Sequence, residues 1–514
     1  MPDVPLTRRS LLTASGTICA AAAGLTAAPT RSAAAPSAAT LPSDPFTLGV
    51  ASGDVRPDAV VLWTRLSPAP TEPGLGMTGQ GPLLVSWQLA TTPDGLDHAP
   101  LACGRTVALP EHAWSVHVDV AGLRPDRPYF YRFRAEGWTS PVGRTRTAPV
   151  PSARRSVRFA VLSCQNLAKP GSGQFYLNGV ADIAARDDLD FVLHLGDYIY
   201  EFGRAGHIPP APCVTLEDYR RRYGQYKSLA DLRALHARFP VYGVPDDHEF
   251  FDNVFGGDPL MTDADRERFS NALQAYWENM PVRGGPPRWD AAARRLHLPL
   301  HRYVRWGREL DLLLVDDRQY RTPDSTILGA GQLDWLLAGV AGSHATWTAI
   351  GSGVPVSWFP EFPGAGDKWT GYEQDRSRLT DALAARLAAR PHRPFNPVVL
   401  SGDIHRALVT HVRRRQDAGA ELVATEFVGA PTTSNSNVDF ARNADTGAFR
   451  GQYAYLADGA LQAYRGYLDC AVSSTSWTTT YVLGNQIEEP GGTVTPFDRW
   501  QLPVDAPVGS VRRL

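Results

Sequence analysis

The sequence predicts an all-β sandwich followed by an α/β sandwich, and two patterns along the 514 residues support this fold class. Between Phe46 and Pro149, short alternating runs of apolar and polar residues are separated by turns rich in proline and glycine, as in antiparallel sheets. Beyond residue 151, continuous apolar runs alternate with helix-like segments, which is typical of a buried, largely parallel sheet. Hydrophobic residues make up 43% of the chain, enough to bury the cores of two or three domains.

The first predicted domain spans residues 40–150 and contains strands at 59–65, 83–89 and 129–134. Residues 122–125 followed by Tyr129 resemble the tyrosine corner of a fibronectin type III or immunoglobulin-like sandwich. A linker rich in proline and arginine ends this domain at residues 148–155.

The second predicted domain is the α/β part, residues 151–514, with a C-terminal extension rich in strands and turns. Its strands are expected at 157–163, 191–195, 240–244, 310–315, 347–351 and 397–400. Its helices are expected at 174–186, 216–238, 263–279, 330–341 and 374–389. Near the C-terminus, residues 468–483 indicate paired strands, and the tail after Pro490 is expected to be rich in turns.

Residues 1–39 are predicted to be a twin-arginine signal peptide. Arg8 and Arg9 precede an alanine-rich apolar stretch, and small residues follow at 33–39, where cleavage is expected. The alternative is a transmembrane anchor, but alanine dominates the stretch and polar residues or glycine interrupt it at 15–17. No later segment has eighteen uninterrupted apolar residues, so we expect a protein secreted through the twin-arginine (Tat) machinery, with no stable membrane span.

Charge and cysteine content exclude several classes of protein. Lys and Arg number 51 and Asp and Glu 53, so the net charge of −2 excludes a basic nucleic-acid-binding protein held mainly by phosphate electrostatics. Five cysteines without a C-x-x-C pair exclude a disulfide scaffold and a clustered thiolate zinc site. If Cys164 binds a metal, at most one disulfide can form among Cys103, Cys213 and Cys470.

Polar residues gather directly after the predicted strands, where ligands bind in open α/β sheets. Five clusters fit this rule, at residues 162–166, 194–201, 245–249, 316–318 and 400–405. Each cluster alone has a structural explanation: a buried cysteine, an Asx turn, a solvated acidic run or a hydrogen-bonded histidine. Together they would crowd several negative charges at one sheet edge, which is costly unless cations are bound.

The clusters therefore predict a site for two or more metal ions. Carboxylates suit hard cations, whereas imidazole, thiolate and phenolate suit a transition metal. Paired metals hold the oxygens of a phosphoryl group and lower the pKa of bound water from 15.7 towards about 7, so hydrolysis of a phosphoric ester is the expected chemistry. The expected ligands are Asp197, Tyr200, Asp247, Asp403 and His405, with Cys164 as a further candidate.

Three motifs resemble those of the calcineurin-like metallophosphoesterases and their purple acid phosphatase branch: Gly196-Asp197-x-x-Tyr200, Asp247-His248-Glu249 and Gly402-Asp403-x-His405. The opening Asp-x-His of that superfamily is replaced here by residues 163–165, its GNHE by 246–249 and its GHxH by 402–405. These substitutions resemble the PhoD-type alkaline phosphatases and phosphodiesterases, a family with related streptomycete-type phospholipases D. Residues 46–54, 62–65 and 367–372 are also similar to that family.

The resemblance implies a ferric iron (Fe³⁺) next to calcium ions (Ca²⁺). Calcium prefers oxygen ligands, which fits carboxylates at the positions where the superfamily has imidazole and amide groups. Asn253 is a weaker calcium candidate, because the spacing after the Asp-His-Glu motif varies. The implied iron ligands are Cys164, Asp197, Tyr200 and His405, and the implied calcium ligands are Asp197, Asp247 and Asp403.

Two residues near the implied metals have open roles. His248, which with Asp247 forms the expected catalytic pair, would hydrogen-bond the phosphoryl oxygens or protonate the leaving group. Its alternative role is to orient Asp247. Arg318 would contact the phosphate of the substrate or, as the favoured alternative, form a structural salt bridge.

The expected function is secreted, metal-dependent hydrolysis of phosphomonoesters and phosphodiesters by attack of a metal-bound hydroxide, as in the alkaline phosphatase D type. One alternative is a phospholipase D acting on phosphatidylcholine. The aromatic stretch 358–363, with Trp369 and Tyr372, would hold a nucleoside or an acyl chain of the substrate, although packing over the sheet explains these side chains slightly better. A remote alternative is a non-catalytic, metal-stabilised extracellular binding protein.

Overall fold

The structure, a computed structural model, describes residues 41–169, 171, 173–358, 365–389, 395–417, 419–435, 453–456 and 464–514. The predicted signal peptide (1–39) and residues 359–363 of the aromatic stretch lie outside the described residues. Within the described part of the chain, no helix combines the length and the apolar character that crossing a bilayer would require.

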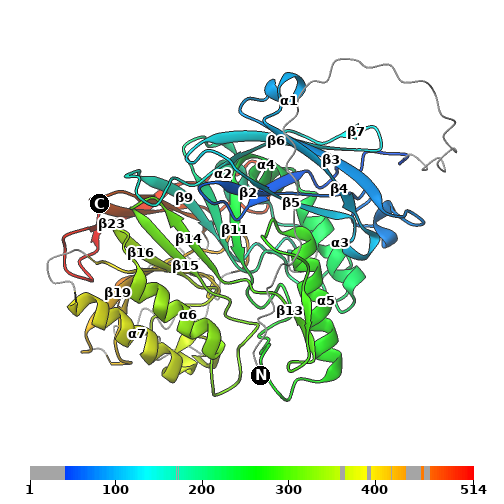
Figure 1. Ribbon diagram of the computed structural model, residues 1–514. Helices are drawn as coiled ribbons and strands as arrows, with labels where there is room; N and C mark the ends of the chain where they lie inside the picture. The colour runs from blue at the N-terminus through cyan, green and yellow to red at the C-terminus, as the bar shows by residue number, and fades with distance from the viewer. Residues whose placement is uncertain are drawn as a thin grey trace, which may run out of the picture.

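Two large β-sheets form the centre of the molecule (Figure 1). The first has ten strands in the order β24-β23-β22-β21-β9-β10-β11-β1-β2-β5, and β9, β10, β11 and β1 run parallel. Their bounds are β24 Arg512–Arg513, β23 Thr495–Pro503, β22 Ser476–Gly484, β21 Arg465–Val472, β9 Val157–Leu162, β10 Phe191–Leu195, β11 Pro240–Val244, β1 Val50–Gly53, β2 Ala59–Arg65 and β5 Ser115–Ala121.

The second large sheet has seven strands in the order β14-β15-β16-β17-β19-β18-β20, and β15, β16, β17 and β19 run parallel. Their bounds are β14 Arg302–Trp306, β15 Leu310–Leu314, β16 Trp347–Gly351, β17 Val398–Ser401, β19 Leu422–Val428, β18 Leu408–Arg413 and β20 Tyr453–Leu456. A small hairpin pairs β12, Arg288–Asp290, with β13, Arg295–His297.

Alternate residues of the central strands are buried on opposite faces of each sheet. Phe191 and Leu193 of β10 share an inner core with Leu312 of β15, while Val192 belongs to a core on the outer side of the ten-stranded sheet. Likewise, Leu313 of β15 belongs to a separate core on the outer side of the seven-stranded sheet. Burial on both faces explains the continuous apolar runs in the sequence.

Helices cover the outer faces of both sheets, so the α/β part has four layers (Figure 1). The ten-stranded sheet is covered by α2 Asn178–Ala185, α3 Leu216–Lys227, α4 Ala230–Arg238 and α5 Asp263–Asn279, and the seven-stranded sheet by α6 Gly329–Gly342 and α7 Glu373–Ala388. Short 3₁₀ helices are η1 Pro73–Gly76, η2 Pro110–His112, η3 Ala365–Asp367 and η4 Trp369–Gly371.

The N-terminal part is β-rich, as predicted, and contains the tyrosine corner. The phenol of Tyr129 accepts a hydrogen bond from the N–H of Arg124 at 2.8 Å and donates to its carbonyl at 3.2 Å. A five-stranded sheet packs over β2 through one shared core, and the fold class is confirmed. Its elements are β3 Leu83–Ala90, β4 Ala102–Ala108, β6 Pro128–Ala135, β7 Trp138–Thr139 and β8 Gly143–Arg146, with α1 Gly95–His98 between β3 and β4.

The sandwich and the α/β part share a sheet, because β1, β2 and β5 continue the ten-stranded sheet beyond β11. The domain boundaries at residues 40, 150 and 151 stay predictions. Cys213 and Cys470 are buried free thiols, so no disulfide forms among the three cysteines considered for pairing.

Two secondary-structure predictions were wrong and a third was partly wrong. The single helix expected at 216–238 is two helices, because Leu229 has an extended backbone (φ −65°, ψ 133°) between α3 and α4. The tail expected to be turn-rich contains the nine-residue strand β23, which pairs with β22. The helix expected from residue 174 begins only at Asn178, since Phe175 instead donates its N–H to the carbonyl of Leu167.

Candidate metal centre

The predicted ligands lie in loops that follow parallel strands of both sheets, at the same edge of the molecule. Cys164 follows β9, Asp197 follows β10 and Asp247 follows β11, while Asp403 and His405 follow β17 of the opposite sheet. Four of these five have left-handed backbones, with φ of 57° at Cys164, 57° at Asp197, 63° at Asp403 and 53° at His405. Such conformations are costly for residues other than glycine and concentrate at functional sites.

The four residues expected to bind iron form one cluster. The ligand atoms of Cys164, Asp197 and His405 all lie within 4.8 Å of one another. The phenol oxygen of Tyr200 is 2.9 Å from Oδ2 of Asp197 and 3.1 Å from Nε2 of His405. The hydroxyl of Ser434, which follows β19, donates to this phenol oxygen at 2.6 Å and so helps to hold the ring.

Two further groups of potential ligands adjoin the first. Asp246, Asp247 and Asp403 form one group within the same 4.8 Å limit, and Asp197, Asp247 and His248 form another. Asp197 and Asp247 each belong to two groups, so the three groups form one continuous site. Each group joins residues from at least two of the loops that follow β9, β10, β11 and β17, and the first group and the group that contains Asp403 join the two sheets.

The buried polar atoms of this site fit bound cations. Oδ1 of Asp197, Oδ2 of Asp246 and Oε1 of Gln165 are buried and have no hydrogen-bond partner in the described structure. Burial raises the pKa of Asp197 and Asp246 far above the usual range, and neighbouring carboxylates add to the effect. Burial likewise raises the pKa of the thiol of Cys164. Cations would compensate the charge of the deprotonated forms, which are the forms that bind metals.

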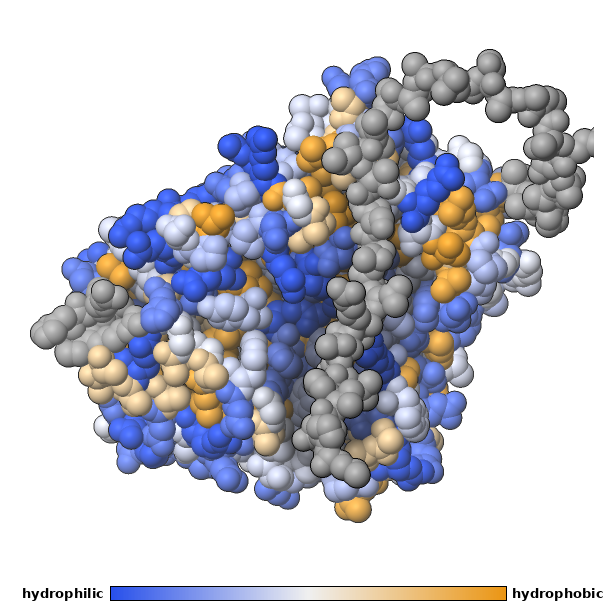
Figure 2. All heavy atoms as spheres, viewed as in Figure 1, coloured by the Kyte–Doolittle hydropathy of each residue, from blue (hydrophilic) through white to orange (hydrophobic). Residues whose placement is uncertain are grey.

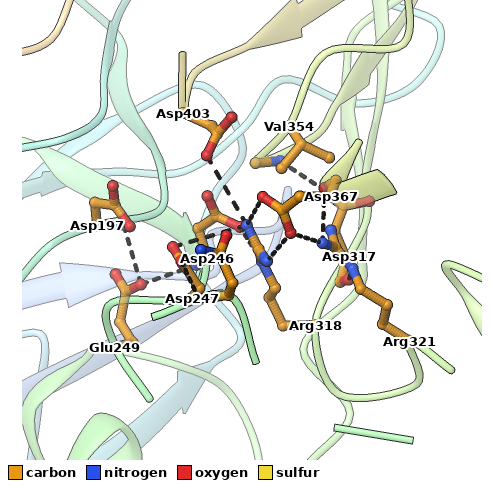
Figure 3. Close-up of polar contacts among 12 residues, drawn as sticks. Asp197, Asp246, Asp247, Glu249, Asp317, Arg318, Arg321, Val354, Asp367 and Asp403 are labelled. Atoms are coloured by element: carbon orange, nitrogen blue, oxygen red, sulfur yellow. Dashed lines mark hydrogen bonds and ion pairs between the residues drawn. The ribbon is translucent and has the colours of Figure 1, made fainter. Parts of the chain in front are cut away.

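Glu249 connects two of the ligand loops. Its buried carboxylate accepts hydrogen bonds from the N–H groups of Asp197 at 3.0 Å, Tyr198 at 2.6 Å and Asp246 at 2.8 Å (Figure 3). Burial raises its pKa to about 7 in spite of these donors. Gly196 allows the loops to approach, since a Cβ there would lie 2.4 Å from Cβ of Asp246 and its φ is 94°.

Arg318 is the main buried cation beside the carboxylates (Figure 3). Its side chain is fully buried, with Nε 2.5 Å from Oδ1 of Asp246, Nη1 2.7 Å from Oδ1 of Asp367 and Nη2 3.7 Å from Oδ1 of Asp247. A second cation, Lys368, lies 3.1 Å from Oδ2 of Asp403. These contacts support the salt-bridge role of Arg318, and its contact with phosphate stays a prediction.

His248 is held by a carboxylate that sequence reasoning did not assign. Nδ1 of His248 lies 2.7 Å from Oε2 of Glu201, whose Oε1 accepts the N–H of Asp252 at 2.9 Å. The His248 ring lies against the ring of Tyr200, with centroids 4.1 Å apart. Burial opposes protonation, but the carboxylates of Asp247, Asp197 and Glu201 outweigh it and raise the pKa of His248.

Three further predicted or suggested residues lie at the edge of this site or away from it. Asn253 is exposed, and its N–H donates to Oδ2 of Asp247 at 2.7 Å, so a calcium contact by its side chain stays a prediction. Trp369 and Tyr372 are buried in the core beneath α7, and Nε1 of Trp369 donates to Ser352 at 3.2 Å. This placement favours the packing explanation of those two aromatic residues.

Glu201, Glu249 and Ser434 are the functional residues that the sequence analysis missed. Glu201 directly follows Tyr200 at the end of the cluster at residues 194–201, and Glu249 ends the quoted Asp247-His248-Glu249 motif, so their positions were a usable signal. Ser434 has no motif around it and lies 234 residues from its partner Tyr200.

Comparisons with known proteins identify the family of this chain. The family described as PhoD-like phosphatase matches residues 159–481, and its N-terminal domain matches residues 31–149. The chain is 33% identical to alkaline phosphatase D of Bacillus subtilis (strain 168) over 530 residues, covering 95% of this chain and 86% of that protein.

Two solved structures are similar to this one. A structure titled "Structure of PhoD" superposes with a TM-score of 0.80 at 30% identity, covering 92% of both chains. Purple acid phosphatase PPD1 from yellow lupin (Lupinus luteus) seeds has a TM-score of 0.53 at 11% identity, covering 88% of this chain and 73% of its own, which shows a shared fold alone. The chain belongs to the PhoD-like phosphatase family and is a phosphoric ester hydrolase.

Proposed function

We propose that this protein hydrolyses phosphomonoesters and phosphodiesters with bound metal ions, in the manner of alkaline phosphatase D. The observation that carries the proposal is the continuous site formed by three ligand groups, in which Asp197 and Asp247 are shared. Bound metals supply Lewis acidity at the phosphoryl oxygens and lower the pKa of a water molecule that can act as the nucleophile.

We assign iron to the ligand group around Tyr200 and calcium to the carboxylates beside it. Thiolate, phenolate and imidazole donors at Cys164, Tyr200 and His405 suit a ferric ion. The oxygen ligands of Asp247 and Asp403, with Asp197 shared, suit Ca²⁺. The unpartnered Oδ1 of Asp197 supports its place between the two kinds of ion.

The chain's own residues then orient the substrate and handle the proton. The bond from Nδ1 to Glu201 leaves Nε2 of His248 as the nitrogen that can donate to a phosphoryl or leaving-group oxygen. Arg318 and Lys368 offset the negative charge of Asp246 and Asp403, which supports the deprotonated state of the ligands.

We also propose secretion through the Tat machinery. The support is the twin-arginine segment, whose residues lie outside the described structure. A direct check is the N-terminal sequence of the protein recovered from culture medium, which should begin near residues 33–39.

The phospholipase D alternative predicts a broad hydrophobic rim for contact with lipid. On the face seen in Figure 2, the described residues are predominantly hydrophilic and the hydrophobic ones occur in small groups. The substrate assay below distinguishes this alternative from hydrolysis of soluble phosphate esters.

The test is hydrolysis by the metal-loaded full chain of an aryl phosphate, a bis-aryl phosphate and phosphatidylcholine. We expect turnover of both aryl substrates, a loss of about a hundredfold or more in Asp197→Asn, and no loss in Asp505→Asn, which removes an exposed carboxylate. Choline release exceeding the other reactions would establish the phospholipase D instead. If none of the phosphate esters is hydrolysed, the non-catalytic, metal-stabilised binding protein would be the remaining alternative.

A further inference from the structure

We propose that a second pocket, separate from the metal centre, binds a phosphorylated small molecule through arginine side chains. This inference goes beyond the proposed function. The pocket has a volume of about 670 Å³, and none of the predicted site residues lines it. Its lining includes Asp54, which follows β1, and Arg302, which pairs with Leu314 at the end of β15.

The buried residues Asp54 and Tyr242 form the floor of the pocket together with the partly buried Arg283 and Arg302. Oδ2 of Asp54 accepts the N–H of Arg283 at 2.6 Å and lies 3.0 Å from Nε of Arg302. The phenol of Tyr242 donates to the carbonyl of Val55 at 2.8 Å. These bonds hold the groups of the floor in fixed positions before any ligand binds, which reduces the entropic cost of binding.

Gly53 allows the segments of the floor to meet. A Cβ at this position would lie 2.5 Å from the carbonyl oxygens of Pro281 and Val241. The motif at residues 46–54, which the metal centre does not use, therefore ends in the residues that shape this pocket.

The lining carries a net positive charge. Four guanidinium groups, those of Arg56, Arg283, Arg288 and Arg302, stand against the single carboxylate of Asp54, which leaves a net charge of +3. The two histidines of the lining do not add to this charge, since burial lowers the pKa of His297 and His301. A chain with a net charge of −2 thus concentrates positive charge at this point.

Two of the arginines are available to a ligand. Arg302 pairs with Asp54, and Arg283 pairs with Asp119 from outside the lining. Arg56 and Arg288 are exposed at the rim, and no ion pair to either is recorded across the described part of the chain. Guanidinium groups bind phosphate oxygens in bidentate geometry. Arg56 and Arg288 therefore favour a ligand with a phosphate group over an uncharged polar ligand.

The size of the pocket favours a small organic phosphate or a short chain of phosphates. Its volume falls in the range of roughly 300–1,000 Å³ that is usual for small-molecule sites. The lining has only one carboxylate, so the pocket is not a divalent cation site. The shared chemistry is a phosphate group, whether as free phosphate or as part of a larger ligand.

The test is equilibrium dialysis of the metal-loaded full chain with labelled inorganic phosphate, and separately with tripolyphosphate. We expect the wild type to bind one more phosphate per chain than the double variant Arg56→Gln/Arg288→Gln, or to bind it at least about tenfold more tightly. The matched control Arg154→Gln removes an exposed arginine away from the pocket and should behave as the wild type. Binding should weaken with salt.

Competitive inhibition by phosphate of aryl phosphate hydrolysis should be the same in all three proteins, because it reports on the metal centre alone. If no phosphoric ester is hydrolysed, the proposed function fails while the difference in bound phosphate still stands. Equal binding by the double variant and the control would overturn the inference. Tighter binding of tripolyphosphate than of phosphate would identify a ligand with several phosphates, and equal affinity would identify inorganic phosphate.

Discussion

Replacing Glu201 with glutamine tests how His248 is held for catalysis. The carboxylate of Glu201 is 2% exposed and accepts from Nδ1 of His248 at 2.7 Å and from the N–H of Asp252 at 2.9 Å. Glutamine keeps the size of the side chain and can still accept from Asp252, but it loses the charge. The substitution therefore weakens one interaction without opening a cavity.

A hydrogen bond to a charged group contributes about 1.5–3 kcal/mol. If Glu201 holds His248 in the transition state, losing this contribution lowers kcat/KM by about 10- to 150-fold, since about 1.4 kcal/mol corresponds to a factor of ten. We expect a larger loss with an alkyl phosphate than with nitrophenyl phosphate, because a poor leaving group depends more on proton donation.

The assay is steady-state kinetics on both substrates, with thermal unfolding of each variant measured in parallel. The control Glu267→Gln alters an exposed carboxylate of α5 and should leave both rates within about twofold. Equal losses with the two leaving groups, accompanied by a lower unfolding temperature, would refute the positioning role and leave a structural one. A loss in kcat/KM smaller than about threefold would also refute the positioning role.

Three further predictions concern other residues of the structure. Arg318→Met leaves Asp246 without its buried cation, while Asp367 keeps its contact with the buried Arg321, and should lower the free energy of unfolding by about 3–5 kcal/mol in urea; a loss below about 1 kcal/mol would contradict the ion-pair role. Cys164→Ser should shift and weaken the visible absorption of the iron-loaded protein, because only the phenolate of Tyr200 then remains as a charge-transfer donor, while bound calcium is retained; an unchanged spectrum would exclude the thiolate as an iron ligand. Burial lowers the pKa of His194 from 6.5 to about 3, so the unfolded chain takes up a proton at this histidine first, and this one group lowers the stability of the wild type by about 3 kcal/mol from pH 7 to pH 4; His194→Phe should lose correspondingly less stability than the wild type, and equal slopes of stability against pH would refute this assignment.

The central strands could be placed from the sequence because burial on both faces makes them continuous apolar runs. The expected strands at 191–195, 240–244 and 347–351 coincide with β10, β11 and β16. The break between α3 and α4 could not be predicted, because the helix-like sequence pattern continues across Leu229. Only the extended backbone conformation of Leu229 in the structure separates the two helices. Strand β23 was missed because it pairs with β22 in a part of the sequence rich in turn residues.

The residues of the candidate metal centre could be expected to lie together because each stands in a short motif after a strand. Their partners were harder to find. Asp367 and Lys368 come from a different segment from the carboxylates and the arginine that they contact, and only the folded chain brings them together. Glu201 is next to Tyr200 in the sequence, but its bond to His248 depends on the approach of β10 to β11.

Metal content measured together with activity tests the central claim most directly. The as-purified full chain would be analysed by elemental mass spectrometry, then assayed on aryl phosphate before chelation, after chelation and after metals are restored. The account predicts bound iron and calcium in fixed ratios to the chain, loss of hydrolysis with the chelator and recovery when both metals return. Full hydrolytic activity in protein that holds neither metal would contradict it.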